Sequence, residues 1–412
     1  LSSSSAASDV YKRQAVALMV QPILKRLAAN AAKDGQSKQA VLVEMLNSLE
    51  TLKTLPGISL LQTRWMESVA RQGTVSLKSR FWNQLTSNFS QLGQQASQVG
   101  IVVYGVVLIS AGDLTMGSLI ACVILSGRTL APMAQLTGLL GRLNQSLTSY
   151  NNLNELMQEP VRENKRQEQI RRPVLTGDID FQNASFCYPE QKKDTLTNIN
   201  VSIKAGEKVA ILGRIGSGKT SLLRLLAGIY EPTSGSVQID HTEVNHLHPE
   251  DLRKGLGVVM QTPMLFSGTV KENLLLGNPN ATDDEIVACA EHSGAAGFIS
   301  QLPDGYETIL TERGQQLSGG QRQALSIARA LVSNPAVIVM DEPTSAMDNA
   351  TEQELVLRLK ASLANKTVIL ITHRGSLLSL VDRVVILDSG RIMADGPKEQ
   401  VLNKLASKKV AQ

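Results

Sequence analysis

The chain has 412 residues, a length that allows two or three domains. Hydrophobic residues make up 42% and charged residues 19%, a balance that fits a chain with both soluble and membrane-embedded parts. The net charge of +4 is too small to argue for nucleic acid as a partner. Cys122, Cys187 and Cys289 lack the spacing of a metal site and suit reduced or membrane surroundings.

The first 14 residues have no hydrophobic continuity with the sequence that follows them. They fit neither a signal peptide nor a helix start. We therefore expect residues 1–14 to be a non-native junction on a truncated gene, with native sequence beginning near Ala15. Residues 15–21 form the apolar end of a helix, and an amphipathic helical pattern runs from there to Arg80, interrupted at residues 55–58.

Two long stretches that are nearly free of charge come next. The 32 residues between Arg80 and Asp113 carry no charge, and residues 114–141 contain only Arg128. Each stretch exceeds the roughly 20 residues that a membrane helix needs. The sequence predicts two membrane helices at residues 84–109 and 114–141, with basic flanks on the cytoplasmic side and the link on the other. A buried pair of helices in a soluble protein is the alternative.

A polar stripe marks the first of these helices. Its members follow the spacing i, i+3, i+7, i+10 and i+14, which places them on one helix face: Gln84, Ser87, Gln91, Gln94 and Gln98. Glutamines that face lipid are costly, so the stripe should face protein or a water-filled path suited to a polar, extended substrate. Equally, part of the stripe could lie outside the membrane.

Residues 158–175 are charged and bounded by prolines, which is typical of a linker between domains. After it, an apolar strand at residues 209–212 leads into a glycine-rich loop and then a helical run at residues 221–226. The loop fits the phosphate-binding pattern GxxxxGK[ST] and consists of Gly213, Arg214, Ile215, Gly216, Ser217, Gly218, Lys219 and Thr220.

This arrangement places phosphates at a helix N-terminus, where free N–H groups and the helix dipole favour negative charge. We expect Lys219 to reach the β- and γ-phosphates and the Thr220 hydroxyl to bind Mg²⁺. A glycine-rich turn without a ligand is the alternative, but a turn needs no Lys-Thr pair.

Two acids end a second apolar strand, at residues 336–340. At the carboxyl end of a parallel strand, Asp341 would hold magnesium, while Glu342 would orient or deprotonate an attacking water. A strand that merely ends in solvated acids is the alternative.

A further motif follows the loop by about a hundred residues: Leu317, Ser318, Gly319, Gly320 and Gln321. Together with the loop and the acid pair, it resembles the ATPase domain of ABC proteins over residues 176–405, with residues 406–412 as a tail. The resemblance implies that Tyr188 stacks on adenine, that Ser221 also binds nucleotide, and that His373 contacts the γ-phosphate. It also implies that Gln261 senses Mg²⁺ and that residues 311–314 touch the transport domain.

The signature motif opens a helix and so forms a second anion-binding helix start. One γ-phosphate cannot easily be held by both helix starts of one domain. In the family, two ATP molecules lie between two subunits, so the resemblance implies a homodimer to which the partner contributes Ser318, Gly319, Gly320, Gln321 and Asp348.

The region before the linker resembles the membrane half of ABC exporters, with residues 46–55 similar to a coupling helix that docks near Gln261. The implied fold is a partial α-helical membrane bundle (residues 15–157) followed by an α/β P-loop ATPase domain. Residues 21–27 and 116–122 resemble bacterial type I secretion exporters. This implies ATP-driven export of a polypeptide across the inner membrane, with surrounding lipid, a periplasmic adaptor and an outer-membrane channel as partners and the ATPase domain in the cytoplasm.

Exporters of lipids, drugs or bacteriocins remain alternatives, as do soluble ABC ATPases of DNA repair and of ribosomes. The repair type inserts a long coiled coil between phosphate loop and signature, whereas only about a hundred residues separate them here. The ribosomal type carries two ATPase domains per chain and no membrane hairpin.

Overall fold

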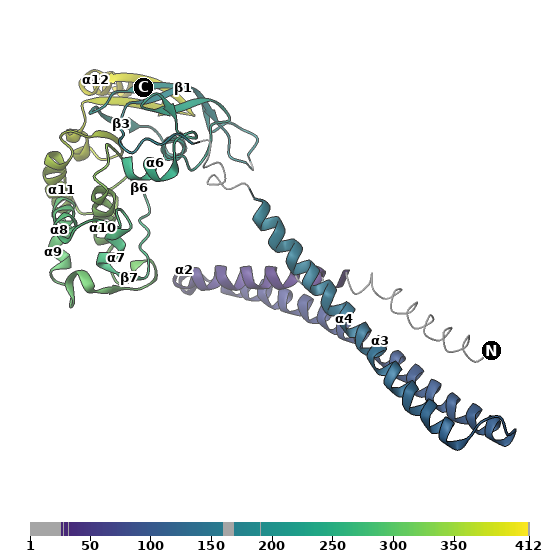
Figure 1. Cartoon of the computed structure of the whole chain (residues 1–412). Coiled ribbons are helices and arrows are strands. Elements are labelled where there is room, and N and C mark those ends of the chain that lie inside the picture. The colour runs from purple at the N-terminus through teal and green to yellow at the C-terminus, as the bar shows by residue number, and fades with distance from the viewer. Residues whose placement is uncertain (1–25, 28, 32, 160–168, 190, 411–412) are drawn as a thin grey trace. The chain divides into compact units, whose positions relative to one another are not determined.

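The computed structural model describes residues 26, 27, 29–31, 33–159, 169–189 and 191–410 (Figure 1). The chain divides into two compact units, Leu1–Pro160 and Val161–Gln412, and each is described by itself. The expected non-native junction at residues 1–14 lies outside the described residues, as do the predicted helix end at 15–21 and residues 160–168 of the linker.

The first unit is helical. Residues 33–47 form a helix, and the short α2 (Leu49–Thr54) lies inside the range predicted for the coupling helix. The long helices α3 (Ile58–Ser110) and α4 (Met116–Gln158) pack together as a hairpin. Gly112 turns the chain with a φ of 81°, and Thr115 caps α4 by accepting a hydrogen bond from the Ser118 N–H at 3.3 Å.

Near the turn, the two helices approach closely at a glycine. A Cβ atom added to Gly105 would lie 2.2 Å from Cδ1 of Leu119, which is 7% exposed in this hairpin. A larger residue at position 105 would therefore displace the Leu119 side chain. This is a close contact between α3 and α4 at the end of the hairpin that contains the apolar residues.

Helix α3 has 53 residues, about 80 Å at 1.5 Å per residue, and so is far longer than a bilayer is thick. Within the described residues it is the one helix long and apolar enough to cross a membrane, and 6% of its most apolar window is buried. Residues 116–128 of α4 form a shorter apolar stretch. The predicted membrane helix 84–109 falls within α3, and the predicted range 114–141 begins two residues before α4.

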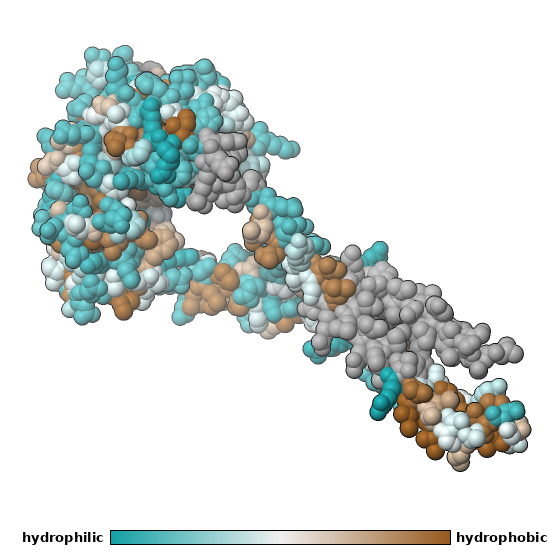
Figure 2. Space-filling view, in the orientation of Figure 1, coloured by the Kyte–Doolittle hydropathy of each residue, from teal (hydrophilic) through white to brown (hydrophobic). Residues whose placement is uncertain are grey.

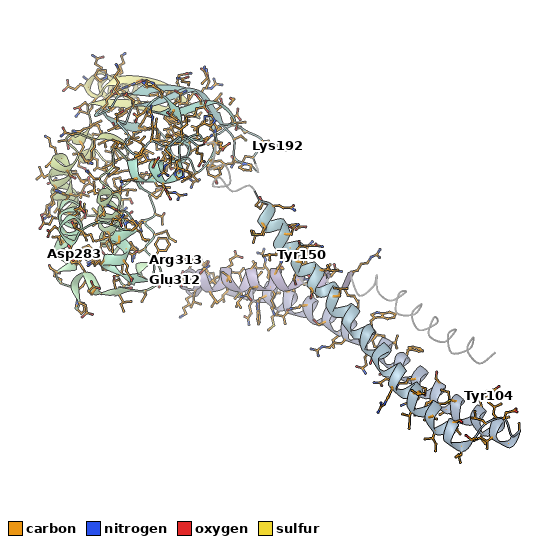
Figure 3. All side chains as sticks on the ribbon, viewed as in Figure 1. Tyr104, Tyr150, Lys192, Asp283, Glu312 and Arg313 are labelled. Atoms are coloured by element: carbon orange, nitrogen blue, oxygen red, sulfur yellow. The ribbon has the colours of Figure 1, made fainter. Side chains whose placement is uncertain are left out.

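At this end of the hairpin, large apolar side chains are exposed, whereas a soluble helix pair would bury them. Val103, Val107 and Leu125 are each more than half exposed, and Figure 2 shows apolar residues gathered there. Tyr104, which is 59% exposed, lies at the same end (Figure 3). An apolar surface of this extent calls for an apolar partner, which favours the membrane interpretation over the buried pair.

The second unit contains two main sheets. An antiparallel sheet has the strand order β2-β1-β4-β5, and a mostly parallel sheet has the order β12-β11-β3-β10-β9-β6. Their strands are β1 (Ile179–Phe186), β2 (Leu196–Ile203), β3 (Lys208–Leu212), β4 (Ser234–Ile239), β5 (Thr242–Glu243), β6 (Leu256–Val259), β9 (Val337–Asp341), β10 (Thr367–Ile371), β11 (Arg383–Asp388) and β12 (Arg391–Pro397). Every residue of β9 and β10 is buried, which explains why their sequences are continuous apolar runs rather than alternating ones.

Helices complete the unit around two hydrophobic cores. They are α5 (Lys219–Leu226), α6 (Pro249–Gly255), α7 (Val270–Leu275), α8 (Asp283–His292), α9 (Ala296–Ile299), α10 (Gly319–Val332), α11 (Asn349–Ser362) and α12 (Lys398–Val410). A small pair of strands, β7 (Gly268–Thr269) and β8 (Ile309–Leu310), lies among the helices. The predicted α/β ATPase fold is confirmed. The domain limits and the linker range stay predictions.

Strand register decides where the functional residues emerge. β10 pairs in parallel with β3 on one side and β9 on the other, so that Ile371 is opposite both Ile211 and Asp341. The carboxyl ends of these three strands therefore meet at one edge of the sheet, which is where open α/β sheets bind ligands.

Asp240 fastens the start of the second unit to its antiparallel sheet. Its carboxylate accepts hydrogen bonds from the Thr176 N–H (2.7 Å) and hydroxyl (2.6 Å) and from the N–H groups of Gly177 and Asp178 (both 2.9 Å). Burial acts to raise the pKa of Asp240, but these hydrogen bonds outweigh it and the pKa is lowered. The ionised carboxylate is thus the form that the fold stabilises.

We expect Asp240→Ala to destabilise the second unit by about 3 kcal/mol, because it removes the acceptor of the buried Gly177 N–H and of the part-buried hydrogen bonds from Thr176 and Asp178. A group with a lowered pKa contributes stability above its unfolded value, about 4, and loses it as the pH falls through the folded value. The difference between parent and variant in urea denaturation should therefore shrink below about pH 4. The control is Asp284→Ala, at an exposed position of α8, which should change the free energy of unfolding little. An equal loss of stability in both variants would contradict this role for Asp240.

Candidate functional site

The phosphate loop joins β3 to α5 in a conformation that requires glycine. Gly216 and Gly218 have φ values of 79° and 102°, and a Cβ atom at Gly213 would lie 2.1 Å from the Leu387 carbonyl oxygen. The Lys219 ammonium group donates to the carbonyl oxygens of Gly213 (2.8 Å) and Arg214 (2.9 Å). The loop thus wraps around its own lysine.

The interior of the loop suits an anion. Burial lowers the pKa of Lys219, and the carboxylates of Glu342 and Asp341 oppose that shift. The Ser217 hydroxyl is buried and has no hydrogen-bond partner, although buried hydroxyls are normally satisfied. A cation next to an unsatisfied hydroxyl at a helix start matches what a phosphate group needs.

A hydroxyl and a carboxylate meet beside the loop. Thr220 Oγ1 donates to Asp341 Oδ2 at 2.7 Å, and Asp341 is 2% exposed. Burial raises the pKa of Asp341, while the hydrogen bond from Thr220 lowers it. Within the described part of the chain there is no cluster of three or more His, Cys, Asp or Glu suited to a metal. Mg²⁺ takes only one or two protein oxygens when phosphates and water supply the rest, so the Thr220–Asp341 pair fits it.

Glu342 lies at the centre of the predicted catalytic group. Its Oε1 is 3.3 Å from Nε2 of His373, and its Oε2 accepts a hydrogen bond from Nε2 of Gln261 at 3.2 Å. These residues follow β9, β10 and β6 respectively, so the strand order brings them together. Glu342 has a φ of 48° and donates its N–H to the Ile371 carbonyl at 2.8 Å. A non-glycine residue held in this conformation is typical of functional sites.

Tyr188 is fixed by contacts that the sequence did not reveal. Its hydroxyl is 2.9 Å from the Ser221 hydroxyl and accepts a hydrogen bond from Nη1 of Arg224 at 2.9 Å. The rings of Phe186 and Tyr230 pack on it at centroid distances of 4.8 and 5.3 Å. Arg224 was missed, although its place three residues after Ser221 on α5 was the available signal. Tyr188 is therefore held in place beside the phosphate loop.

The signature motif caps α10. Ser318 accepts from the Gln321 N–H at 3.2 Å, and the Gln321 side chain accepts from the Ser318 N–H at 2.8 Å, which is a capping box. Among the hydrogen bonds of the described residues, none joins residues 318–321 to the phosphate loop. A Cβ atom on Gly319 would instead lie 2.8 Å from Cβ of Ala346, so this motif packs on residues 345–348, which we call the D-loop.

Asp348 ends the D-loop and caps α11, accepting from the Thr351 N–H at 2.8 Å and hydroxyl at 2.9 Å. These hydrogen bonds lower its pKa.

The segment predicted to touch the transport domain includes Glu312 and Arg313, which follow β8 (Figure 3), and Arg313 has a φ of 59°. Sequence analysis also missed three residues near the D-loop. Gln323 and Arg374 form hydrogen bonds to its backbone, and Glu352 pairs with Arg374.

Comparisons with known proteins agree with this geometry. Residues 196–345 match the family described as ABC transporter, and residues 15–133 match the ABC transporter transmembrane region. The chain is 34% identical over 385 residues to the leukotoxin export ATP-binding protein LtxB of Aggregatibacter actinomycetemcomitans. It is also 34% identical over 389 residues to the leukotoxin translocation ATP-binding protein LktB of Mannheimia haemolytica. Both alignments cover 93% of this chain and 54% of the relative, so the chain spans about half the length of these curated relatives.

A solved structure is similar as well. A bacterial Atm1-family ABC exporter with ATP bound superposes with a TM-score of 0.88 at 28% sequence identity, covering 97% of this chain and 70% of that one. The agreement extends over both the helical unit and the α/β unit. The chain belongs to the ABC transporter family and joins transmembrane-region helices to an ATPase domain in one polypeptide.

Proposed function

We propose that this chain hydrolyses ATP at the site around Glu342. The observation that carries the proposal is the convergence of Gln261, Glu342 and His373 from three strands, next to the Thr220–Asp341 pair. A carboxylate held between an amide and an imidazole, beside a loop shaped for phosphate, has what is needed to activate a water for phosphoryl transfer.

Each residue has a defined part in this proposal. Lys219 and residues 213–218 and 220–221 bind the phosphates, while Tyr188 supplies a flat ring for adenine. Glu342 orients the attacking water and accepts its proton, and His373 contacts the γ-phosphate. Thr220, Asp341 and Gln261 would hold Mg²⁺, which would supply positive charge beside the phosphates.

The same proposal includes two copies of the chain. The capping box satisfies Ser318 and Gln321 internally, and the motif lies on the D-loop of its own domain rather than on its own phosphate loop. A second copy would bring Ser318, Gly319, Gly320, Gln321 and Asp348 to the phosphate loop of the first. Two ATP molecules would then be bound between identical subunits.

We further propose that hydrolysis drives export of a polypeptide across the bacterial inner membrane, with the ATPase domain in the cytoplasm. Two relatives are named for leukotoxin export and translocation, and the apolar end of the hairpin is exposed as a lipid-facing surface would be. Gln84, Ser87, Gln91 and Gln98 are exposed in the single chain and suit a polar substrate path. A periplasmic adaptor and an outer-membrane channel would complete the route.

Glu342→Gln should retain ATP binding and lower kcat at least about 100-fold, because it keeps the shape of the side chain but removes the base. ATP should then hold two copies together, as measured by light scattering with and without nucleotide. Glu354→Gln, at an exposed position of α11, is the matched control and should hydrolyse normally. A Glu342→Gln protein with a rate near that of the parent would show that Glu342 is not the base.

The shared site can be tested by mixing two inactive variants. Lys219→Ala spoils the phosphate loop and Ser318→Arg spoils the signature, so a heterodimer of the two retains one intact composite site. ATPase activity of the mixture should exceed that of either variant alone. If heterodimers form, as shown by differently tagged subunits, and no activity returns at any ratio, the two-subunit site is wrong.

The membrane orientation can be tested by cysteine labelling in a variant that lacks the native cysteines. A cysteine in place of Asp113 should react with a membrane-impermeant maleimide in intact cells, and one in place of Lys53 only after lysis. Basic flanks resist translocation, which sets this orientation. Labelling of Lys53→Cys but not Asp113→Cys in intact cells would reverse it.

A further inference from the structure

The D-loop is held on one side by a buried glutamine of the signature helix. Gln323, which is 2% exposed, donates from Nε2 to the Ser345 hydroxyl at 2.6 Å and to the Glu342 carbonyl at 3.4 Å. Its Oε1 accepts from the Ala346 N–H at 3.0 Å. One side-chain amide thus joins α10 to the residue at the catalytic centre and to the loop that follows it.

On the other side, the D-loop is held by an arginine. Nη1 of Arg374 donates to the Met347 carbonyl at 3.1 Å, and Nη2 donates to the Ser345 carbonyl at 3.3 Å. Nη1 also forms an ion pair with Oε2 of Glu352 at 2.5 Å. The remaining oxygen of Glu352 accepts from the Ser376 hydroxyl.

The ion pair explains why the arginine stays in place. Glu352 is 3% exposed and therefore needs a cation close by, since an unpaired buried carboxylate is very costly. A planar guanidinium can bind the carboxylate and both loop carbonyls together, which the single ammonium of a lysine cannot do with the same geometry. The pair therefore fixes Arg374, and Arg374 fixes the backbone of the D-loop.

Arg374 also directly follows His373, whose imidazole faces Glu342 at 3.3 Å. A shift of the backbone at His373 would therefore be passed to the residue whose guanidinium binds the Ser345 and Met347 carbonyls. The D-loop begins three residues after Glu342 and ends at Asp348.

We propose that Arg374, anchored by Glu352, and Gln323 are positioning residues that together clamp the D-loop, and that Arg374 links its conformation to that of His373. The proposal rests on the proposed function, in which the D-loop completes the ATP site of a second copy. Among the hydrogen bonds and ion pairs of the described residues, none joins Arg374 or Gln323 to the phosphate loop, so we expect them to affect geometry and not nucleotide affinity.

Hydrogen–deuterium exchange tests the clamp without any need for activity. In Arg374→Ala, the amides of residues 345–348 should exchange about tenfold faster or more, because charge-assisted hydrogen bonds to their backbone are lost. Gln323→Met keeps the size of the side chain and should have the same effect, most strongly at Ala346. The control is Arg358→Ala, which removes another Arg–Glu pair of α11, one that is 39% and 65% exposed and does not touch the loop.

Kinetics test the positioning role. Arg374→Ala should lower kcat about tenfold or more while the KM for ATP stays within about twofold, and Arg374→Lys should restore only part of the rate. Glu352→Gln should reproduce the loss, and the double variant should be no worse than either single one, because the two residues act as a unit. Arg358→Ala should keep the kcat of the parent.

Unchanged exchange in residues 345–348 of Arg374→Ala would overturn the clamp, and faster exchange with an unchanged kcat would overturn its role in positioning. A rise in KM that accounts for the whole loss would also contradict it. These results differ from failure of the proposed function, which would appear as hydrolysis by Glu342→Gln at the rate of the parent.

Discussion

The parallel pairing of β10 with β3 and β9 is the constraint on which the site depends. This register puts Ile371 opposite Ile211 and Asp341, so three loops that are far apart in sequence begin at the same level of the sheet. The phosphate loop, the two acids and His373 can then meet without any long connection. A slip of one residue in this pairing would move Asp341 out of line with the end of β3, so the geometry of the site depends on the register.

The charges gathered there balance one another. Burial acts to lower the pKa of Lys219 and to raise that of Asp341, and each group limits the shift of the other. Removing one of them would therefore leave the other in an unfavourable environment. The site tolerates Lys219, Asp341 and Glu342 close together because they carry charges of both signs. The N–H groups at the start of α5 also favour anions.

Much of this could be predicted from sequence because the motifs are local. The phosphate loop needs glycine at fixed positions, and the strands predicted at residues 209–212 and 336–340 begin and end within one residue of β3 and β9. The carboxyl-edge placement of Asp341 and Glu342 followed from the rule for open α/β sheets. By contrast, the contact of Glu342 with Gln261 and His373 depends on strand order, which no single motif encodes. Only the family resemblance connected these three residues.

The residues that were missed share a physical reason. Gln323 and Arg374 act through side chains that reach across the fold: Arg374 reaches Glu352 and Gln323 reaches Ser345, each 22 residues away. Such pairings have no period along the chain. The α3–α4 hairpin shows the opposite case. Its apolar stretches were visible in the sequence, but the composition did not show that α3 would be longer than a bilayer is thick.

The signature helix shows how one polar network can leave a surface ready for a ligand. The capping box uses the N–H groups of Ser318 and Gln321, and Gln323 is occupied with the D-loop. Helix geometry gives the N–H groups of Gly319 and Gly320 no intrahelical acceptor, and the absence of side chains leaves them accessible. Because Gly319 lies against Ala346, a displacement of the D-loop would change the surroundings of these donors. In the proposed dimer, a conformational change at His373 of one subunit would be transmitted through Arg374 and the D-loop to the start of α10. That helix start would bind the ATP of the other subunit.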